Sequence, residues 1–348
     1  MCETGEMPPL PMRIMKKMLV ILAVFCLVGC DSGSDALCGN GRVENGEECE
    51  SPDGVCGSGC VIDREWAAWP LPPDAPADTD YTVDTDIVTD NVTNLVWQRN
   101  VHYSRRTWEE AVTYCEDLVL TGHNDWHLPN GHNDWHLPTV IELSSIFDFG
   151  RMHPAFNTAA FPATPDVEFW SSTSYAGDTT RVWSVYFMSL ISFQPNDKSH
   201  SNYVRCVRGG PLVADVQAGA PPGRFTALAD TVVDNVTGLL WQRSVPQSEQ
   251  DWTSAVTHCD DMELSSFNDW RLPKAKELLS IVDRRAHEPA IDASVFPGTP
   301  SSRFWSSSPI FNIRGGSVFM ACVSFADGHV NIKRKTSTRH VRCVRNGP

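Results

Sequence analysis

A long passage of this sequence occurs twice, and the repeat limits what the chain can fold into. Residues 90–99 read DNVTNLVWQR and return at 234–243 as DNVTGLLWQR, and each copy closes with the same VRCVR, at 204–208 and 341–345. Each unit spans about 120 to 130 residues, which is the size of a domain and exceeds that of a solenoid repeat. We therefore expect two tandem domains, each with its own hydrophobic core.

A shorter duplication lies inside the first unit. The passage GHNDWHLP occurs twice in immediate succession, from Gly122 and from Gly131, whereas the second unit has a single NDWRLP. Only one of Trp126 and Trp135 can therefore occupy the place of Trp270. A helix is expected directly after the second passage and holds its tryptophan at a fixed distance. We expect Trp135 inside the domain and Trp126 on a looped-out segment of about nine residues, a length that costs little closure entropy.

The composition is that of an ordinary globular protein. Of the 348 residues, 41% are hydrophobic and 20% are charged, which leaves enough apolar material for two small cores. The formal net charge of −15 argues against nucleic-acid binding by the chain as a whole. Acidic residues dominate the first unit, whereas the second is close to neutral and carries basic residues near its end.

The N-terminus has the pattern of an export signal. Basic residues precede an apolar run at 18–28, which ends in Leu-Val-Gly before Cys30. The run is shorter than the roughly 20 residues that cross a membrane, so we expect residues 1–29 to be a cleaved signal peptide. The Leu-x-Gly-Cys ending resembles the bacterial lipobox, which implies that Cys30 becomes the lipidated first residue; ordinary signal cleavage is the alternative. The lipid would anchor the chain to a membrane of the cell envelope, with the outer membrane or surface favoured.

A cysteine-rich segment follows a short tether at 30–37. Its four cysteines have few apolar residues around them: Cys38, Cys49, Cys56 and Cys60. In an exported protein this composition predicts a disulfide-stapled segment at 38–60 whose pairing stays open, and a zinc site is the alternative. The segment resembles the cysteine-rich repeats of proteins secreted by predatory soil bacteria. Proline-rich composition predicts linkers at 61–79 and 209–224, which places the two domains at 80–208 and 225–348.

The first helix expected in each domain is amphipathic and carries a cysteine. In the first unit apolar residues recur at helical spacing over 108–118, and Thr107 with Glu110 has the spacing of a capping box. The second unit repeats this pattern, so Cys115 and its counterpart Cys259 should face the interior. The other expected elements are a short helix from Thr139 and strands at 182–187 and 317–325.

The closing strand of each unit carries a second cysteine. One cysteine on the first helix and one on the last strand predict a single bridge in each domain, Cys115–Cys206 and Cys259–Cys343. Each bridge would close a loop of about 85 to 90 residues, which the chain-entropy model makes worth on the order of 4 kcal/mol. Cys322 is then odd, and we expect it to be a buried free thiol.

The ordered motifs of both units resemble those of a known family. They are Asp-x-x-Thr-Gly-Leu-x-Trp-Gln, Asp-Trp-Arg-Leu-Pro-x-x-x-Glu-Leu, Phe-Trp-Ser-Ser-Ser and the closing Val-Arg-Cys-Val-Arg. They resemble the Legionella collagen-like protein C-terminal domain family. The resemblance implies an α+β fold of two tandem C-type-lectin-like domains, each with two helices packed on twisted antiparallel sheets. That superfold uses the helix-to-last-strand disulfide expected above. The name-giving member binds sulfated polysaccharides as an adhesin, which implies a binding function.

Two motifs with the form of metal sites are present in the first unit. Two histidine pairs have the i, i+4 spacing of a helical zinc site, His123 with His127 and His132 with His136. Each pair follows a glycine and runs into Leu-Pro, which disfavours a helix, and the second unit lacks both histidines. The Gln-Pro-Asn-Asp at 194–197 resembles the sugar-and-calcium motif of C-type lectins but has no counterpart in the second unit. We therefore predict no metal and no cofactor.

One strong basic cluster lies near the C-terminus, formed by Lys333, Arg334, Lys335, Arg339, Arg342 and Arg345. Clustered cations raise the local concentration of anions, so these residues are a candidate site for sulfated or acidic polysaccharide. A solvated strand edge is the alternative. No catalytic triad, nucleophile elbow or phosphate-binding loop is evident, so we assign no catalytic residue.

The sequence thus predicts an extracytoplasmic lipoprotein, anchored to a membrane, whose non-catalytic domains bind polysaccharide or another surface ligand. Nucleic acid is not an expected partner. Two alternatives stay open. The first is a divergent enzyme of the formylglycine-generating superfold, whose members use a reactive cysteine pair. The second is a structural component of the envelope.

Lipidation of Cys30 predicts that the protein fractionates with membranes and needs detergent for extraction. In the variant Cys30→Ser the acyl anchor cannot form, so the chain should move to the soluble fraction when cells are lysed and centrifuged. A wild-type protein that is equally soluble without detergent would contradict the anchor.

Overall fold

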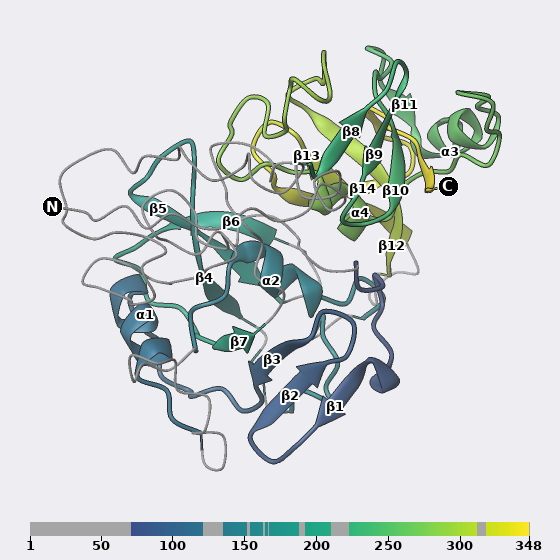
Figure 1. Cartoon of the computed structure of the whole chain (residues 1–348). Coiled ribbons are helices and arrows are strands. Elements are labelled where there is room, and N and C mark those ends of the chain that lie inside the picture. The colour runs from purple at the N-terminus through teal and green to yellow at the C-terminus, as the bar shows by residue number, and fades with distance from the viewer. Residues whose placement is uncertain are drawn as a thin grey trace, which may run out of the picture.

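The computed structural model describes residues 71–120, 135–151, 154–162, 164–165, 167–187, 192–209, 223–311 and 318–347. In these residues the fold is mixed α and β, with mostly antiparallel sheets and few helices (Figure 1). The cysteine-rich segment and the expected export signal lie outside the described residues.

The elements of the first unit are η1 (Asp78–Asp80), β1 (Tyr81–Val83), β2 (Ile87–Asp90), β3 (Leu95–Gln98), α1 (Trp108–Glu116), α2 (Val140–Ser145), β4 (Glu168–Ser174), β5 (Arg181–Tyr186), β6 (Ser192–Asp197) and β7 (Val207–Gly209). Those of the second unit are β8 (Phe225–Ala227), β9 (Thr231–Asp234), β10 (Leu239–Gln242), β11 (Gln250–Asp251), α3 (Trp252–Asp260), α4 (Ala275–Ser280), β12 (Arg303–Phe311), β13 (Val318–Ser324), β14 (Val330–Arg334), β15 (Thr338–Arg339) and β16 (Val344–Asn346).

The two units repeat one sheet topology. Each has a four-stranded sheet, in the orders β1-β2-β3-β7 and β8-β9-β10-β16, and a three-stranded sheet, β4-β5-β6 and β12-β13-β14. The last strand pairs with the strand that carries the repeated Trp-Gln, and Trp97 lies opposite Val207 as Trp241 lies opposite Val344. The two repeated motifs of each unit are therefore neighbours in space.

The expected helices are confirmed, and their caps explain where they begin. Thr107 and Glu110 form the capping box of α1, with Thr107 N donating to the glutamate at 2.9 Å. Asp251 caps α3 by accepting from Ser254 N at 3.0 Å. The expected strands are also present, as β5 and β13.

The expected position of Trp135 is confirmed. Its side chain is 2% exposed, as is that of Trp270 in the second unit. The next residue bonds the closing strand in both units, because His136 N donates to Val207 O and Arg271 N donates to Val344 O, each at 2.9 Å. Trp126 lies outside the described residues.

The expectation of one separate core per unit is wrong in part. Each unit has its own small apolar cluster around its disulfide. The largest cluster, however, contains buried residues of both units, and α2 packs against α4 in the centre of the molecule (Figure 1). The two units therefore share one core.

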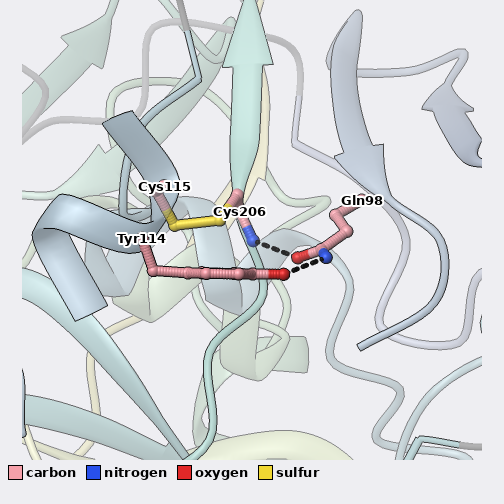
Figure 2. Close-up of a disulfide and its surroundings, with 4 residues drawn as sticks. All are labelled: Gln98, Tyr114, Cys115 and Cys206. Atoms are coloured by element: carbon pink, nitrogen blue, oxygen red, sulfur yellow. Dashed lines mark hydrogen bonds between the residues drawn. A yellow bond between two sulfur atoms is a disulfide. The ribbon is translucent and has the colours of Figure 1, made fainter. Parts of the chain in front are cut away.

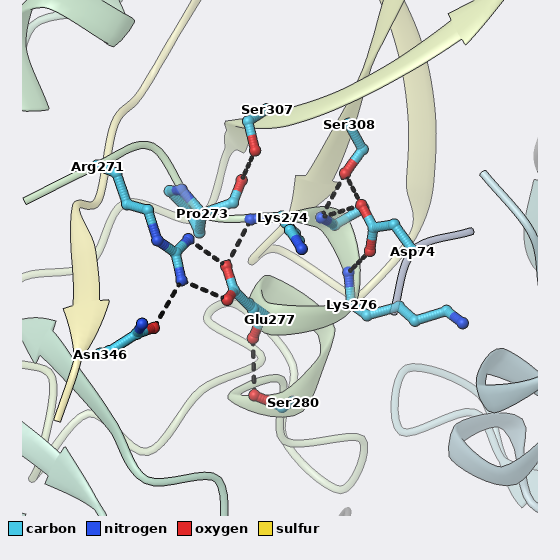
Figure 3. Close-up of polar contacts among 11 residues, drawn as sticks. Asp74, Arg271, Pro273, Lys274, Lys276, Glu277, Ser280, Ser307, Ser308 and Asn346 are labelled. Atoms are coloured by element: carbon cyan, nitrogen blue, oxygen red, sulfur yellow. Dashed lines mark hydrogen bonds and ion pairs between the residues drawn. The ribbon is translucent and has the colours of Figure 1, made fainter. Parts of the chain in front are cut away.

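A buried lysine lies at this junction. Lys276 of α4 is 3% exposed, and its ammonium group donates to Ser145 O at the end of α2 and to Pro73 O, both at 2.8 Å. Asp74 accepts from Lys276 N at 3.2 Å and from the Ser308 hydroxyl, as Figure 3 shows. Pro73 and Asp74 belong to the segment that composition predicts to be a linker, and here they contact both units.

The junction compensates for a difference between the repeats. In the second unit Arg224 donates to the buried carboxylate of Asp234 at 2.9 Å and to Ser280 O at 2.8 Å. The first unit has Asp80 at the position of Arg224. The cation that reaches the carbonyl matching Ser280 O is Lys276, from the other unit. Burial raises the pKa of Asp90, the counterpart of Asp234, and the charge of Lys276 opposes that rise.

Lys276 predicts a specific pH dependence of stability. Burial lowers its pKa to about 8, against about 10.4 in an unfolded chain. The folded protein therefore loses this proton at a lower pH than the unfolded chain does, and burial of the charge costs stability below pH 8. The free energy of unfolding should rise relative to that of Lys276→Met between about pH 8 and pH 10.4, by at most about 3 kcal/mol.

Urea unfolding of both proteins across this pH range, with the disulfides intact, measures the difference. Groups common to the two proteins, such as Cys322, cancel in the comparison. Parallel stability profiles would show that Lys276 is not buried in its charged form.

Candidate functional site

The two disulfides hold the first helix of each unit to the residue just before its last strand. The structure contains Cys115–Cys206 and Cys259–Cys343, as expected. Around the first, Gln98 accepts from Cys206 N at 3.2 Å and donates to the Tyr114 hydroxyl at 2.8 Å (Figure 2). These cysteines are therefore structural in both units.

The remaining cysteine of the described residues is Cys322, which is buried and free as expected. Burial raises the pKa of its thiol to about 12, so the thiol stays neutral at physiological pH. The other predicted cysteine positions lie outside the described residues: Cys30, Cys38, Cys49, Cys56 and Cys60.

A tryptophan under a lysine recurs at the start of each first helix. In the second unit Trp252 donates to Ser306 O at 2.9 Å, and Lys335 Nζ lies 3.9 Å from the centre of its ring. In the first unit Trp108 has the same kind of backbone bond, and Lys198 Nζ lies 4.4 Å from its ring. Both units therefore keep this cation–π pair.

A glutamate with an Arg or His partner occupies the same position in each unit. In the second unit Glu277 accepts two bonds from Arg271, at 2.7 and 2.8 Å, and a third from Lys274 N at 2.7 Å (Figure 3). Hydrogen bonding to Glu277 raises the pKa of Arg271. In the first unit His136 faces Glu142 at 3.2 Å instead.

These residues line an open groove of about 570 Å³ in the second unit. Its walls are formed by Trp252, Val256, Asp260, Arg271, Leu272, Lys274, Glu277, Ser307 and Asn346. Lys274 is exposed and forms no ion pair among the described residues. An aromatic side chain with fixed polar groups around it can bind a ligand that has both apolar and hydroxyl faces.

The basic cluster predicted from the sequence is only partly a surface. Arg342 is fully buried and donates to Gln242 O at 2.6 Å and to Thr299 Oγ1 at 2.6 Å. Burial lowers the pKa of Arg342 to about 9. Its prediction as a polyanion-binding residue is wrong, because the side chain satisfies buried acceptors and cannot reach a ligand.

The other members of the cluster are at or near the surface. Arg345 is held by the carboxylate of Asp269, at 2.6 and 3.1 Å, and lies over the ring of Phe267. Lys333 and Arg334 lie on β14, Lys335 covers Trp252, and Arg339 lies on β15.

Where the structure describes the motifs with metal-site form, their side chains contact carboxylates of the same unit. His136 faces Glu142, whereas His123, His127 and His132 lie outside the described residues. On β6, Asn196 donates to the Glu168 carboxylate at 3.0 Å, and Gln194 donates to it as well. The described part of the chain has no group of three or more His, Cys, Asp or Glu residues that could hold a metal ion.

None of the helices in the described ranges is long and apolar enough to cross a membrane. Sequence reasoning did not identify the groove. The feature that could have indicated the groove is the Trp252–Lys335 pair, which recurs as Trp108–Lys198. The two members of each pair are far apart in the sequence, so no local pattern links them.

A search of the curated proteins finds no match to this chain. A family model, the Lcl C-terminal domain, matches residues 86–131, 130–208 and 230–345, which together cover more than half of the chain. The match to the first unit breaks at the boundary between the two GHNDWHLP passages, whereas the second unit matches in one piece. The extra passage is therefore an insertion relative to the family, and the chain belongs to the Lcl C-terminal domain family.

Proposed function

We propose that this protein is a lipoprotein of the cell envelope whose two C-type-lectin-like domains bind polysaccharide without catalysis. At the level of the family, the Lcl C-terminal domain suggests non-catalytic extracellular binding of an adhesin-like kind. The anchor at Cys30 and the identity of the ligand are parts of the proposal.

The groove of the second unit is the observation that carries the binding function. It is open, so a polymer can lie across it without threading an end. Trp252 offers an apolar edge, and Lys274, Ser307 and Asn346 offer donors and acceptors at fixed positions around it. Sugars are recognised by this combination of apolar contact and directed hydrogen bonds.

The alternative enzyme would need reactive cysteines. The cysteines of the first helices are paired in disulfides with those just before the last strands, and the free Cys322 is buried with a raised pKa. These observations support a binding function over cysteine chemistry. A structural role in the envelope is the other alternative, and failure to bind any glycan would favour it.

A glycan array probed with the full chain should identify the polysaccharide. Lys274→Ala and Asn346→Ala each remove a group of the groove that no buried residue needs. Lys274→Ala should weaken binding to the best glycan by about tenfold, since a hydrogen bond to a charged group is worth about 1.5 kcal/mol or more. Asn346→Ala removes a neutral group and should weaken binding by about fivefold.

Asp230→Ala, which changes an exposed residue outside the groove, is the matched control and should bind as the wild type does. Unchanged affinity in both groove variants would show that the ligand binds elsewhere. A wild type that binds no glycan would contradict the proposed function.

A further inference from the structure

A second open groove, of about 560 Å³, runs beside α1 in the first unit and shares no residue with the groove at Trp252. We call it the α1 groove, and its lining includes Arg106, Glu109, Glu110, Tyr114, Asp117 and Val119. Glu110, Tyr114 and Asp117 follow one another at intervals of about one helical turn, so the groove follows the helix axis. Helices α1 and α3 lie at opposite ends of the molecule (Figure 1), so both grooves can be occupied together.

The floor of the α1 groove is aromatic and apolar. The guanidinium carbon of Arg106 lies 4.0 Å from the centre of the Tyr114 ring, and Arg106 also donates to Ser104 O at 3.1 Å. This cation is therefore held against the ring. At the other end of the groove Val119 is 69% exposed. An apolar side chain of a ligand would gain contact area there.

The rim of the α1 groove is acidic. The carboxylate of Glu110 accepts from Thr107 N at 2.9 Å in the capping box. The exposed carboxylates of Glu109 and Asp117 have no hydrogen bond or ion pair among the described residues. Three carboxylates against one guanidinium give the groove a net negative charge, which attracts a cationic ligand.

The second unit shows that the fold does not require this surface. Its helix α3 has the same length of nine residues as α1 and carries a cysteine at the same place. At the positions of Glu109, Glu110 and Val119 it has Thr253, Ser254 and Glu263. The acidic rim and the exposed valine at its end therefore belong to the first unit alone.

The chemistry of the α1 groove suits basic side chains better than sugar hydroxyls. Lysine and arginine have a long apolar stem that can pack on the floor and a charged head that can reach the rim. Sugar hydroxyls need both donors and acceptors, whereas this groove offers mainly carboxylate acceptors and its guanidinium is already held by Tyr114 and Ser104.

We propose that the α1 groove is a docking site for a basic amphipathic helix of a partner protein. Glu110 and Asp117 are seven residues apart, which is about 10 Å along the helix axis. A helix that lies along α1 therefore meets both ends of the rim with basic residues two turns apart, at i and i+7, and places apolar residues between them over the floor. This interaction goes beyond the proposed function, because the first unit would hold a protein while the second binds polysaccharide.

The test measures calorimetric binding of synthetic peptides to the full chain. The probe is a helical peptide with lysines seven residues apart and leucines at the turn between them. One comparison peptide has glutamate in place of each lysine, and another has the composition of the probe in scrambled order. The wild type should bind the probe, with an affinity that falls as salt is added, and should bind neither comparison peptide.

The charged rim is tested by the double variant Glu109→Thr/Asp117→Asn, which should weaken binding of the probe by about fivefold. The matched control is Asp261→Asn/Glu263→Gln, which removes two exposed carboxylates at the end of α3. It should change the affinity by less than about twofold. Unchanged melting temperatures establish that the variants are folded.

The apolar floor is tested by Val119→Glu, which copies the second unit and adds a negative charge. If the leucines of the probe pack on this end of the groove, the variant should weaken binding by about fivefold, because the added carboxylate must lose water. Attraction to negative charge alone would strengthen binding instead. The sign of this change therefore separates docking in the groove from general electrostatic attraction.

Stronger binding by Val119→Glu, or equal losses in the two double variants, would overturn the proposal. Failure of the wild type to bind the probe would overturn it as well. Chitosan oligomers, which carry amines on a sugar backbone, are the further probe. If they bind through Glu109 and Asp117 while the peptide does not, the ligand is a cationic sugar and the inference of a protein partner is wrong. Glycan binding that depends on Lys274 is measured separately, so the proposed function can stand when this inference fails.

Discussion

The two copies of one domain dock around a buried lysine at their junction. Lys276 donates to the carbonyl of Ser145 in the other unit and to that of Pro73 in the segment before the first strand. A charge in an apolar interior is costly unless polar groups surround it. The carbonyls of these two segments cannot be assembled around it unless the units have docked, so this lysine couples docking to folding.

The repeat explains why the coupling runs in one direction. Arg224 neutralises the buried Asp234 within the second unit, whereas the first unit has Asp80 in its place. The second unit thus supplies a cation to its own buried aspartate. The buried Asp90 of the first unit has the charge of Lys276 instead. The second unit thus supplies the cation that the first unit lacks.

Local patterns in the sequence were sufficient for much of the fold. Helical spacing identified α1 and α3, and the two cysteines of each unit predicted its disulfide, because both signals lie within one repeat. The place of Trp135 followed from its fixed distance to the next helix. The sequence did not indicate the shared core, the contacts of Asp74 or the burial of Arg342. These depend on contacts between distant segments, which periodicity along the chain does not encode.

Calorimetric unfolding of the full chain with its disulfides intact tests most directly whether the two units form one body. A shared core with a buried lysine predicts one cooperative transition, with equal calorimetric and van't Hoff enthalpies. It also predicts that Lys276→Ala lowers or divides that transition, because the carbonyls of Ser145 and Pro73 lose their donor. Two independent transitions in the wild type, unchanged by Lys276→Ala, would contradict the account.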